Sequence, residues 1–138
     1  MTRRLLFSMA LGIFGLRVQG QSGSTCTDTK KPAITQPLDG GNVVLTDIIR
    51  GTSPCPAMKH YVVVTPPNGT DWVQGKPFTF GANGLFTTQA QFGEGSNGIK
   101  DTFLIRILVT KDTLRAGQLP QMPADAILSD AVSATRVR

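Results

Sequence analysis

Four turn dipeptides divide this chain into short segments and limit what it can fold into. They are Asp39-Gly40, Asn68-Gly69, Asn83-Gly84 and Asn97-Gly98. Each pairs an Asn or Asp with a Gly, and these residues tolerate the positive φ angles that tight hairpin turns need. The last three are 15 and 14 residues apart, close to one strand plus one turn. With the β-branched and aromatic runs between them, they predict an all-β sandwich of short antiparallel strands.

The first twenty residues have the pattern of a secretory signal peptide, which predicts a secreted or periplasmic protein. Two arginines come first, and the apolar run over residues 5–16 that follows is too short to span a bilayer comfortably. Val18 and Gly20 are small enough to precede a cleavage site, so we expect a mature chain from Gln21. We expect no stable membrane insertion after cleavage, and a retained membrane anchor is the alternative.

Removing the signal changes the charge balance of the chain. The whole sequence has 14 basic and 9 acidic residues, and three of the basic ones lie in the signal, leaving eleven against nine. No dense Lys/Arg cluster remains, so we expect no nucleic-acid partner. The remaining length suits one domain with its own core, with a polar leader at residues 21–31 and the domain over residues 32–138.

Apolar patterns between the turns predict about seven strands. Residues 59–65 contain a continuous apolar run, typical of a central strand that is covered on both faces. Residues 85–92 alternate between apolar and polar side chains, as in a strand with one buried face. The strongest strand covers residues 103–109. Its inward stripe is Phe103, Ile105, Ile107 and Val109.

Two further segments are less regular. Residues 42–50 read as one strand, and its alternation slips near Thr46, which indicates a β-bulge. Residues 111–117 favour a short helix, placed ahead of a closing strand over residues 129–137. The same region leaves a second reading open, in which residues 125–134 are helical.

Taken together, these stretches resemble the immunoglobulin-like (Ig-like) domains of bacterial extracytoplasmic proteins. The matching stretches are ITQPLDG (34–40), IRGT (49–52), HYVVVTP (60–66), DWVQ (71–74), NGLF (83–86) and FLIRI (103–107). The resemblance covers nearly the whole mature chain and implies an Ig-like antiparallel sandwich. Such domains mostly serve as spacers, adhesion modules or partner-binding modules. The resemblance therefore implies a non-enzymatic module for protein interaction, adhesion or structural support.

Strand order in an Ig-type sandwich bears on the two cysteines. The first strand of such a sandwich starts at the end where the second strand finishes. Cys26 precedes the first predicted strand and Cys55 follows the second, so both should lie at that end. An exported chain enters an oxidising compartment, and we expect Cys26 and Cys55 to form a disulfide. Two free thiols are the alternative.

No set of residues in the sequence indicates catalysis. His60 is the only histidine, it lies in an apolar strand, and there is no Gly-x-Ser-x-Gly motif for a hydrolase nucleophile. Glu94 is the only glutamate, and we expect most aspartates to cap turns. Neither a calcium-binding loop nor a phosphate-binding loop is present. We therefore expect no enzyme, no metal site and no cofactor.

Trp72, Phe78 and Phe80 form the candidate binding patch of the sequence. They lie on two short pieces, residues 71–74 and 77–80, which a Gly and a Pro interrupt as at a sheet edge. If exposed, such aromatics can stack on sugar rings or anchor a protein partner. If buried, they close one end of the sandwich. Two functions stay open: a module that binds an unknown extracytoplasmic protein, or a carbohydrate-binding module that uses the patch around Trp72.

Overall fold

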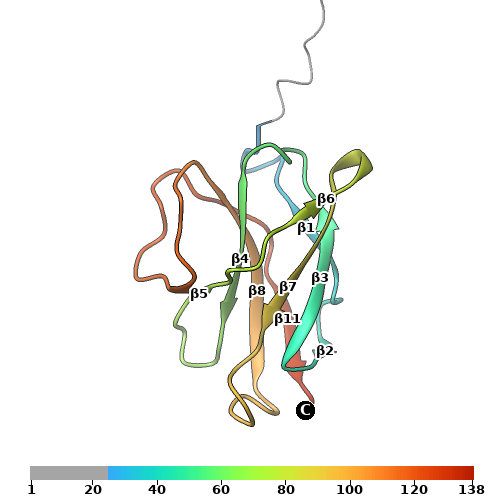
Figure 1. Ribbon diagram of the computed structural model, residues 1–138, viewed down its shortest axis with the longest axis vertical. Helices are drawn as coiled ribbons and strands as arrows, with labels where there is room; N and C mark the ends of the chain where they lie inside the picture. The colour runs from blue at the N-terminus through green and yellow to red at the C-terminus, as the bar shows by residue number, and fades with distance from the viewer. Residues whose placement is uncertain (1–24) are drawn as a thin grey trace, which may run out of the picture.

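Two β-sheets pack face to face in the computed structural model, which describes residues 25–138 (Figure 1). The predicted signal peptide, residues 1–20, lies outside the described residues. Seven strands in the described part have three or more residues and four have two, while the only helical element there is one 3-10 turn. The predicted all-β sandwich of about seven main strands is confirmed.

The smaller sheet, called here the first sheet, has four strands in the order β1-β3-β7-β6. Their bounds are β1 Ala33–Gln36, β3 Thr46–Thr52, β7 Leu85–Gln91 and β6 Thr79–Phe80, and the 3-10 turn η4 (Ala82–Gly84) joins β6 to β7. Every second residue of β7 is buried, beginning with Phe86. This is the alternation predicted from the sequence, and it gives the first sheet one buried and one exposed face.

The larger, second sheet has seven strands in the order β2-β11-β8-β4-β5-β9, with β10 pairing β8 beside this path. Their bounds are β2 Gly41–Val43, β11 Val132–Arg136, β8 Thr102–Thr110, β4 Lys59–Thr65, β5 Trp72–Val73, β9 Gly117–Gln118 and β10 Ile127–Leu128. The β2–β11 pair is parallel, which the purely antiparallel prediction missed. β11 lies within the predicted closing strand, so the alternative helix over residues 125–134 is wrong.

The main core lies between the two sheets. Its fully or nearly buried members are Val43, Ile49, Val62, Val64, Phe86, Ala90, Phe92, Phe103, Ile105, Ile107 and Ala134. Three residues of the predicted inward stripe of β8 belong to this cluster, and the fourth, Val109, is buried beside the two cysteines. Burying each large side chain contributes about 1.5–3 kcal/mol, so this interface is the chief source of stability.

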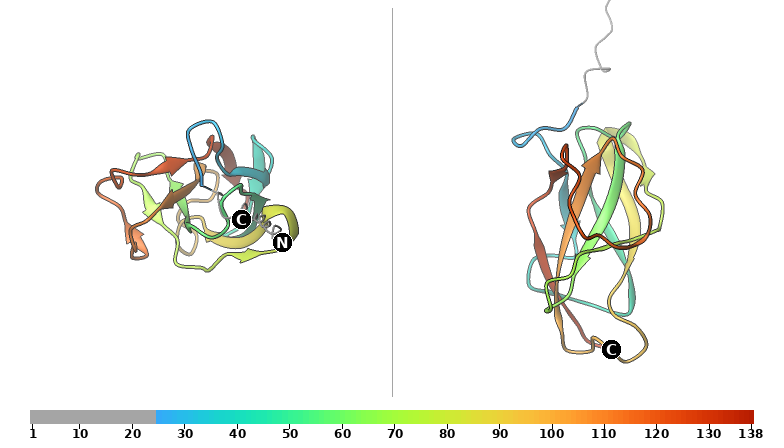
Figure 2. Two further views of the ribbon diagram at one scale, coloured as in Figure 1. Left: turned by 90° about the horizontal axis from the view of Figure 1, so that it is seen from above. Right: turned by 90° about the vertical axis from the view of Figure 1, so that its left-hand side faces the viewer.

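The second sheet is also covered on its outer face, by the segment over residues 111–128 (Figure 2, right). Val63 of β4 and Leu108 of β8 are completely buried under it. The helix predicted over residues 111–117 is absent, and this segment is held against the outer face of the sheet as a loop instead. The Lys111 amide donates to Asp125 over 2.9 Å, and the Leu114 amide donates to the Tyr61 hydroxyl over 3.0 Å.

Residues 42–50 are not one bulged strand as predicted, because the chain changes sheets there. β2 belongs to the second sheet and β3 to the first. At the start of β3 the carboxylate of Asp47 accepts hydrogen bonds from the amides of Val44 (3.1 Å) and Ile48 (2.8 Å). Val44 lies between the two strands, so the carboxylate satisfies a donor at the crossing. The slip in alternation therefore marks a crossing between layers.

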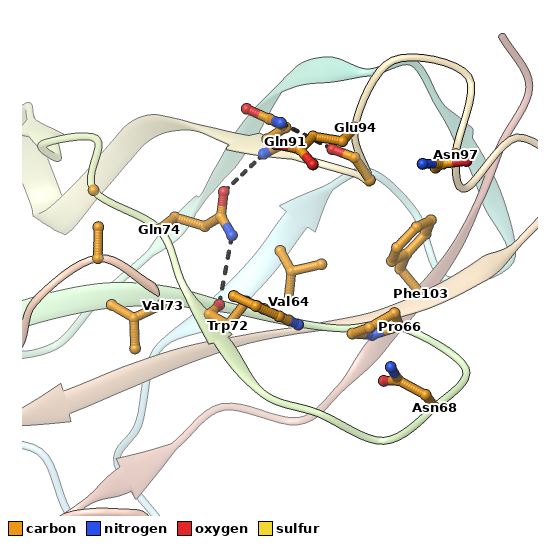
Figure 3. Close-up of a pocket in the computed structure, with 13 residues that line it drawn as sticks. Val64, Pro66, Asn68, Trp72, Val73, Gln74, Gln91, Glu94, Asn97 and Phe103 are labelled. Carbon is orange, nitrogen blue, oxygen red and sulfur yellow. Dashed lines mark hydrogen bonds between the residues drawn. The ribbon is translucent and has the colours of Figure 1, made fainter. Parts of the chain in front are cut away.

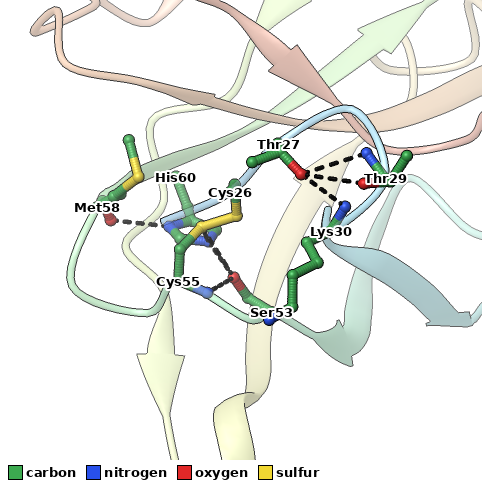
Figure 4. The surroundings of a disulfide bond; sticks show 8 residues. All are labelled: Cys26, Thr27, Thr29, Lys30, Ser53, Cys55, Met58 and His60. Atoms are coloured by element: carbon green, nitrogen blue, oxygen red, sulfur yellow. Dashed lines mark hydrogen bonds between the residues drawn. A yellow bond between two sulfur atoms is a disulfide. The ribbon is translucent and has the colours of Figure 1, made fainter. Parts of the chain in front are cut away.

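A disulfide joins Cys26 to Cys55 at one end of the sandwich, as predicted (Figure 4). The two Cα atoms are 5.5 Å apart, and Cys55 is completely buried. Val109 of β8 packs against both cysteines, with Met58 and Ile127 at the margin of this small cluster. The bond ties the chain ahead of β1 to the loop after β3, which closes the first sheet at that end.

We predict that removing the disulfide destabilises the domain by about 3–4 kcal/mol. A separation of 29 residues between the cysteines sets the size of the closed loop, and this figure follows from the loop-closure entropy of the unfolded chain. Urea unfolding of the mature wild type and of the Cys26→Ala, Cys55→Ala double variant would measure the difference. Intact mass after alkylation is the control: two alkylated thiols before any reduction would contradict the bond.

Candidate functional site

A cleft opens at the side of the sandwich, next to Trp72 (Figure 3). Its volume is about 740 Å³. It is lined by Val64, Pro66, Asn68, Trp72, Val73, Gln74, Gly75, Gln91, Gly93, Glu94, Asn97, Phe103 and Ala116. We call it the Trp72 cleft. Pro66, Asn68 and Trp72 form one wall, and Gln91, Glu94 and Asn97 form the other, with Val64 and Phe103 between them.

Strand pairing sets the direction of the Trp72 side chain. Trp72 is the direct partner of Val64 on β4, and paired residues of an antiparallel ladder share one face. Val64 belongs to the core between the sheets, so Trp72 also points inward. The Trp72 side chain is nevertheless 41% exposed, because β5 lies beyond the cover that the first sheet provides. An inward-facing aromatic ring is thus left open to solvent.

β5 is held on both sides, so Trp72 does not sit on a free edge as the sequence predicted. β9 pairs with it, placing Gln118 opposite Trp72. The preceding residue, Asp71, accepts hydrogen bonds from the Thr65 hydroxyl (2.6 Å) and the Arg106 guanidinium (3.1 Å). Its carbonyl accepts the amide of Leu119 over 2.8 Å. These contacts position the wall of the cleft that carries Trp72.

Arg136 of β11 holds the opposite wall. Its side chain is only 2% exposed, and its guanidinium donates to the carbonyls of Phe92 (3.0 Å), Asn97 (2.8 Å) and Gly95. All three carbonyls belong to the connection between β7 and β8, which also carries Glu94. A single buried cation thus satisfies the backbone of this loop and fixes its shape.

Several polar side chains at the cleft keep hydrogen-bonding capacity for a ligand. The Gln74 amide is engaged, because its Oε1 accepts the Gln91 backbone amide over 2.8 Å and so links the two sheets. Gln91 donates its Nε2 to the Gly93 carbonyl (2.8 Å), and Asn68 uses its Oδ1 to accept the Thr70 amide (2.9 Å). Glu94 is exposed. The cleft therefore combines one open aromatic ring with amide and carboxylate groups.

The structure brings Phe78 and Phe80 together but does not place Trp72 with them. Phe78 and Phe80 stack at 5.8 Å between ring centroids and pack against the core of the sandwich, where both contact Phe86. Phe80 also meets the ring of His60, four residues before Val64 on β4. Four residues of strand span about 13 Å. The predicted patch is split because β5 and β6 belong to different sheets.

His60 is buried at the disulfide end, remote from the Trp72 cleft, with both ring nitrogens engaged (Figure 4). The Met58 carbonyl can only accept, so Nδ1 carries the proton and donates to it over 2.8 Å. Nε2 of the neutral ring then accepts the Ser53 hydroxyl over 2.7 Å. Burial lowers the pKa of His60 from 6.5, against the opposing effect of the Met58 hydrogen bond.

Within residues 25–138, no three His, Cys, Asp or Glu side chains gather where they could hold a metal ion. The same residues contain no helix long and apolar enough to cross a membrane. A scan of protein-family models finds none that matches the chain, and no curated protein matches it.

Sequence reasoning identified Trp72 but missed the polar side chains that surround it. The sequence identifies Asn68 and Asn97 only as turn residues, and Glu94 only as the single glutamate. The available signal is indirect. The turn with Asn68 follows β4 and the turn with Asn97 precedes β8, and these two strands pair with one another. Arg136 gave no signal at all, since the carbonyls it binds leave no trace in the sequence.

We predict that Arg136→Lys loosens the wall of the cleft that carries Glu94. A lysine ammonium is a compact charge and cannot reach three carbonyls at once as the planar guanidinium does. Amide hydrogen exchange over residues 93–101 should accelerate at least about tenfold, in line with a loss of roughly 1.5–3 kcal/mol in charged hydrogen bonds. Exchange over β3 serves as the internal reference. Unchanged exchange in the loop would contradict the role given to Arg136.

We also predict that stability falls as the pH drops below about 6.5. The folded-state pKa of His60 is lowered, so the unfolded chain binds the proton more readily and protonation favours unfolding. The contribution is complete above the unfolded value and is lost as pH falls towards the folded one. Urea unfolding at about pH 7.5 and about pH 5 would measure it. The His60→Phe variant should lose this slope, whatever its overall stability.

Asp39 and Asp125 titrate in a separate, lower range of pH. Hydrogen bonds from the Ser133 amide and hydroxyl lower the pKa of Asp39 from 3.8. The Thr110 hydroxyl and the Lys111 amide lower the pKa of Asp125 in the same way. Their contributions are present above the usual value and are lost only at lower pH. An equal slope in wild type and His60→Phe would therefore contradict the assignment to His60.

Proposed function

We propose that this chain is a non-enzymatic Ig-like binding module of the secreted or periplasmic space, and that its ligand enters the Trp72 cleft. The observation that carries the proposal is Trp72, an inward-facing ring that remains 41% exposed in a cleft of about 740 Å³. Large exposed aromatics in concave sites are the usual anchors of ligand and protein recognition. If the ligand is a protein, the module serves protein interaction, adhesion or structural support. The alternative ligand is a glycan.

The disulfide supports the proposed location. Such bonds form and persist in oxidising compartments, and the Cys26–Cys55 bond is buried in a small cluster of its own. The pattern of the first twenty residues favours export independently of the disulfide. The two-sheet sandwich is compatible with the Ig-like fold that the sequence resembles.

The surroundings of His60 support a non-enzymatic role. A general base needs a ring nitrogen within reach of a substrate. Here Nδ1 is bonded to the Met58 carbonyl and Nε2 to the Ser53 hydroxyl, and the ring is packed against Phe78 and Phe80. His60 is thus engaged in holding the disulfide end together, while the open cleft lies at Trp72.

We predict that the mature chain retains a component of the extracytoplasmic fraction of its source organism, and that Trp72→Ala reduces retention at least about tenfold. The matched control is Leu104→Ala, which removes a side chain of similar exposure (45%) from β8, outside the cleft lining. Bound protein and bound carbohydrate are assayed separately after capture on the immobilised wild type and both variants. Far-ultraviolet circular dichroism confirms that each is folded.

Either of two results would overturn the proposal. One is the absence of any retained material on a folded wild type. The other is equal retention by the wild type, Trp72→Ala and Leu104→Ala, since the cleft would then make no contribution. Hydrolytic turnover abolished by His60→Ala would contradict the non-enzymatic part.

A further inference from the structure

We propose that the ligand of the Trp72 cleft is a saccharide without acidic groups, one ring of which stacks on Trp72 while Glu94 and the neighbouring amides bind its hydroxyls. This inference rests on the proposed function and names its ligand class. Three features of the cleft carry it: the isolated aromatic ring, the pairing of free donors with free acceptors, and the sign of the only charge in the lining.

Trp72 is the one large apolar side chain in the lining that is exposed. Val64 and Val73 are buried at 3% exposure and Phe103 at 2%, and Pro66 is half-buried. Figure 3 shows the indole on the same side of the cleft as Pro66. The face of an indole is electronegative and attracts the weakly positive C–H face of a pyranose ring. A protein partner would gain from further anchors beside the ring, and the other large apolar side chains of the lining, Val64, Val73 and Phe103, are buried.

The polar groups around the ring match what hydroxyls require. Asn68 uses its Oδ1 within its own turn, which leaves its two N–H donors for a ligand. Gln91 has the opposite arrangement, since its Nε2 donates to Gly93 and its Oε1 remains. The Glu94 carboxylate can only accept. Each sugar hydroxyl both donates and accepts, so a cleft that offers free donors and free acceptors together suits it.

Charge excludes the acidic members of the ligand class. Glu94 is the only charged residue among the thirteen that line the cleft, and none of them is Lys or Arg. A uronate, sulfate or phosphate group would meet the like charge of Glu94, and the Arg136 guanidinium behind this wall is buried with its N–H groups donated to backbone carbonyls. Neutral sugars, and sugars that carry an amine, meet no such repulsion. The cleft should therefore discriminate between glycans by charge as well as by shape.

The test uses the single tryptophan of the chain as its probe. The mature protein is produced in a bacterial host, so that the Asn68-Gly69-Thr70 triplet, an acceptor pattern for N-glycosylation, stays unmodified. It is screened on an array of neutral, amine-bearing and acidic oligosaccharides. Binders are then titrated by Trp fluorescence and by calorimetry. We expect a saturable change in the Trp72 emission with at least one neutral or amine-bearing member, and none with oligogalacturonate.

Variants separate the parts of the argument. Calorimetry should show a loss of at least about tenfold in affinity for Trp72→Ala and no change for Leu104→Ala. Glu94→Gln should weaken binding of the neutral ligand by roughly tenfold, since it removes a charged acceptor. The same variant should gain affinity for acidic sugars relative to the wild type, which a purely structural role of Glu94 would not produce.

The outcomes distinguish this inference from the proposed function. If no neutral or amine-bearing sugar binds, or if an acidic one binds more tightly, the saccharide assignment is wrong. If the sugars fail while a captured protein depends on Trp72, the binding module stands and its ligand is a protein. If sugars bind equally well to Trp72→Ala, the cleft is not their site and both the inference and the proposed site fall.

Discussion

The burial of β4 and β8 on both faces is the constraint on which the rest of the structure depends. Val62 and Val64 of β4 face the first sheet, while Val63 between them faces away and would be exposed if the sandwich had only two layers. The chain therefore has to return over the outer face, which it does through residues 111–128. Covering that face removes several apolar side chains from water, each worth about 1.5–3 kcal/mol.

The same return of the chain builds the candidate site. β9 belongs to this returning segment and pairs with β5, which widens the second sheet beyond β4. The first sheet has fewer strands and does not cover this extension. Trp72 faces inward on this extension, so it belongs geometrically to the core but has no layer above it. Arg136 fixes the opposite wall through backbone carbonyls. Both walls are thus held by main-chain hydrogen bonds, which favours a site formed before its ligand arrives.

Local patterns were predicted well from the sequence, and assignments to a sheet were not. The alternation of β7 and the inward stripe of β8 follow from a period of two residues, which depends only on the strand itself. The change of sheet after β2 depends on which distant strand is available to pair. The separation of Trp72 from Phe78 has the same origin, because five residues of chain suffice to cross from one layer to the other. Residues 111–117 form a loop where the sequence predicts a helix, and they contact residues as distant in the sequence as Tyr61.

Turn residues explain why the cleft carries no recognisable motif. Asn68-Gly69 and Asn97-Gly98 form turns in which both glycines have positive φ angles, and the asparagine of each pair lines the cleft. Asn68 shows how one residue can serve both purposes, since its Oδ1 stabilises the turn and its amide N–H groups remain for a ligand. Because the turn alone accounts for such an asparagine, the local sequence reads as that of an ordinary turn. The recognition chemistry becomes visible only where the fold sets the β4–β5 turn and the β7–β8 connection on opposite walls of the Trp72 cleft.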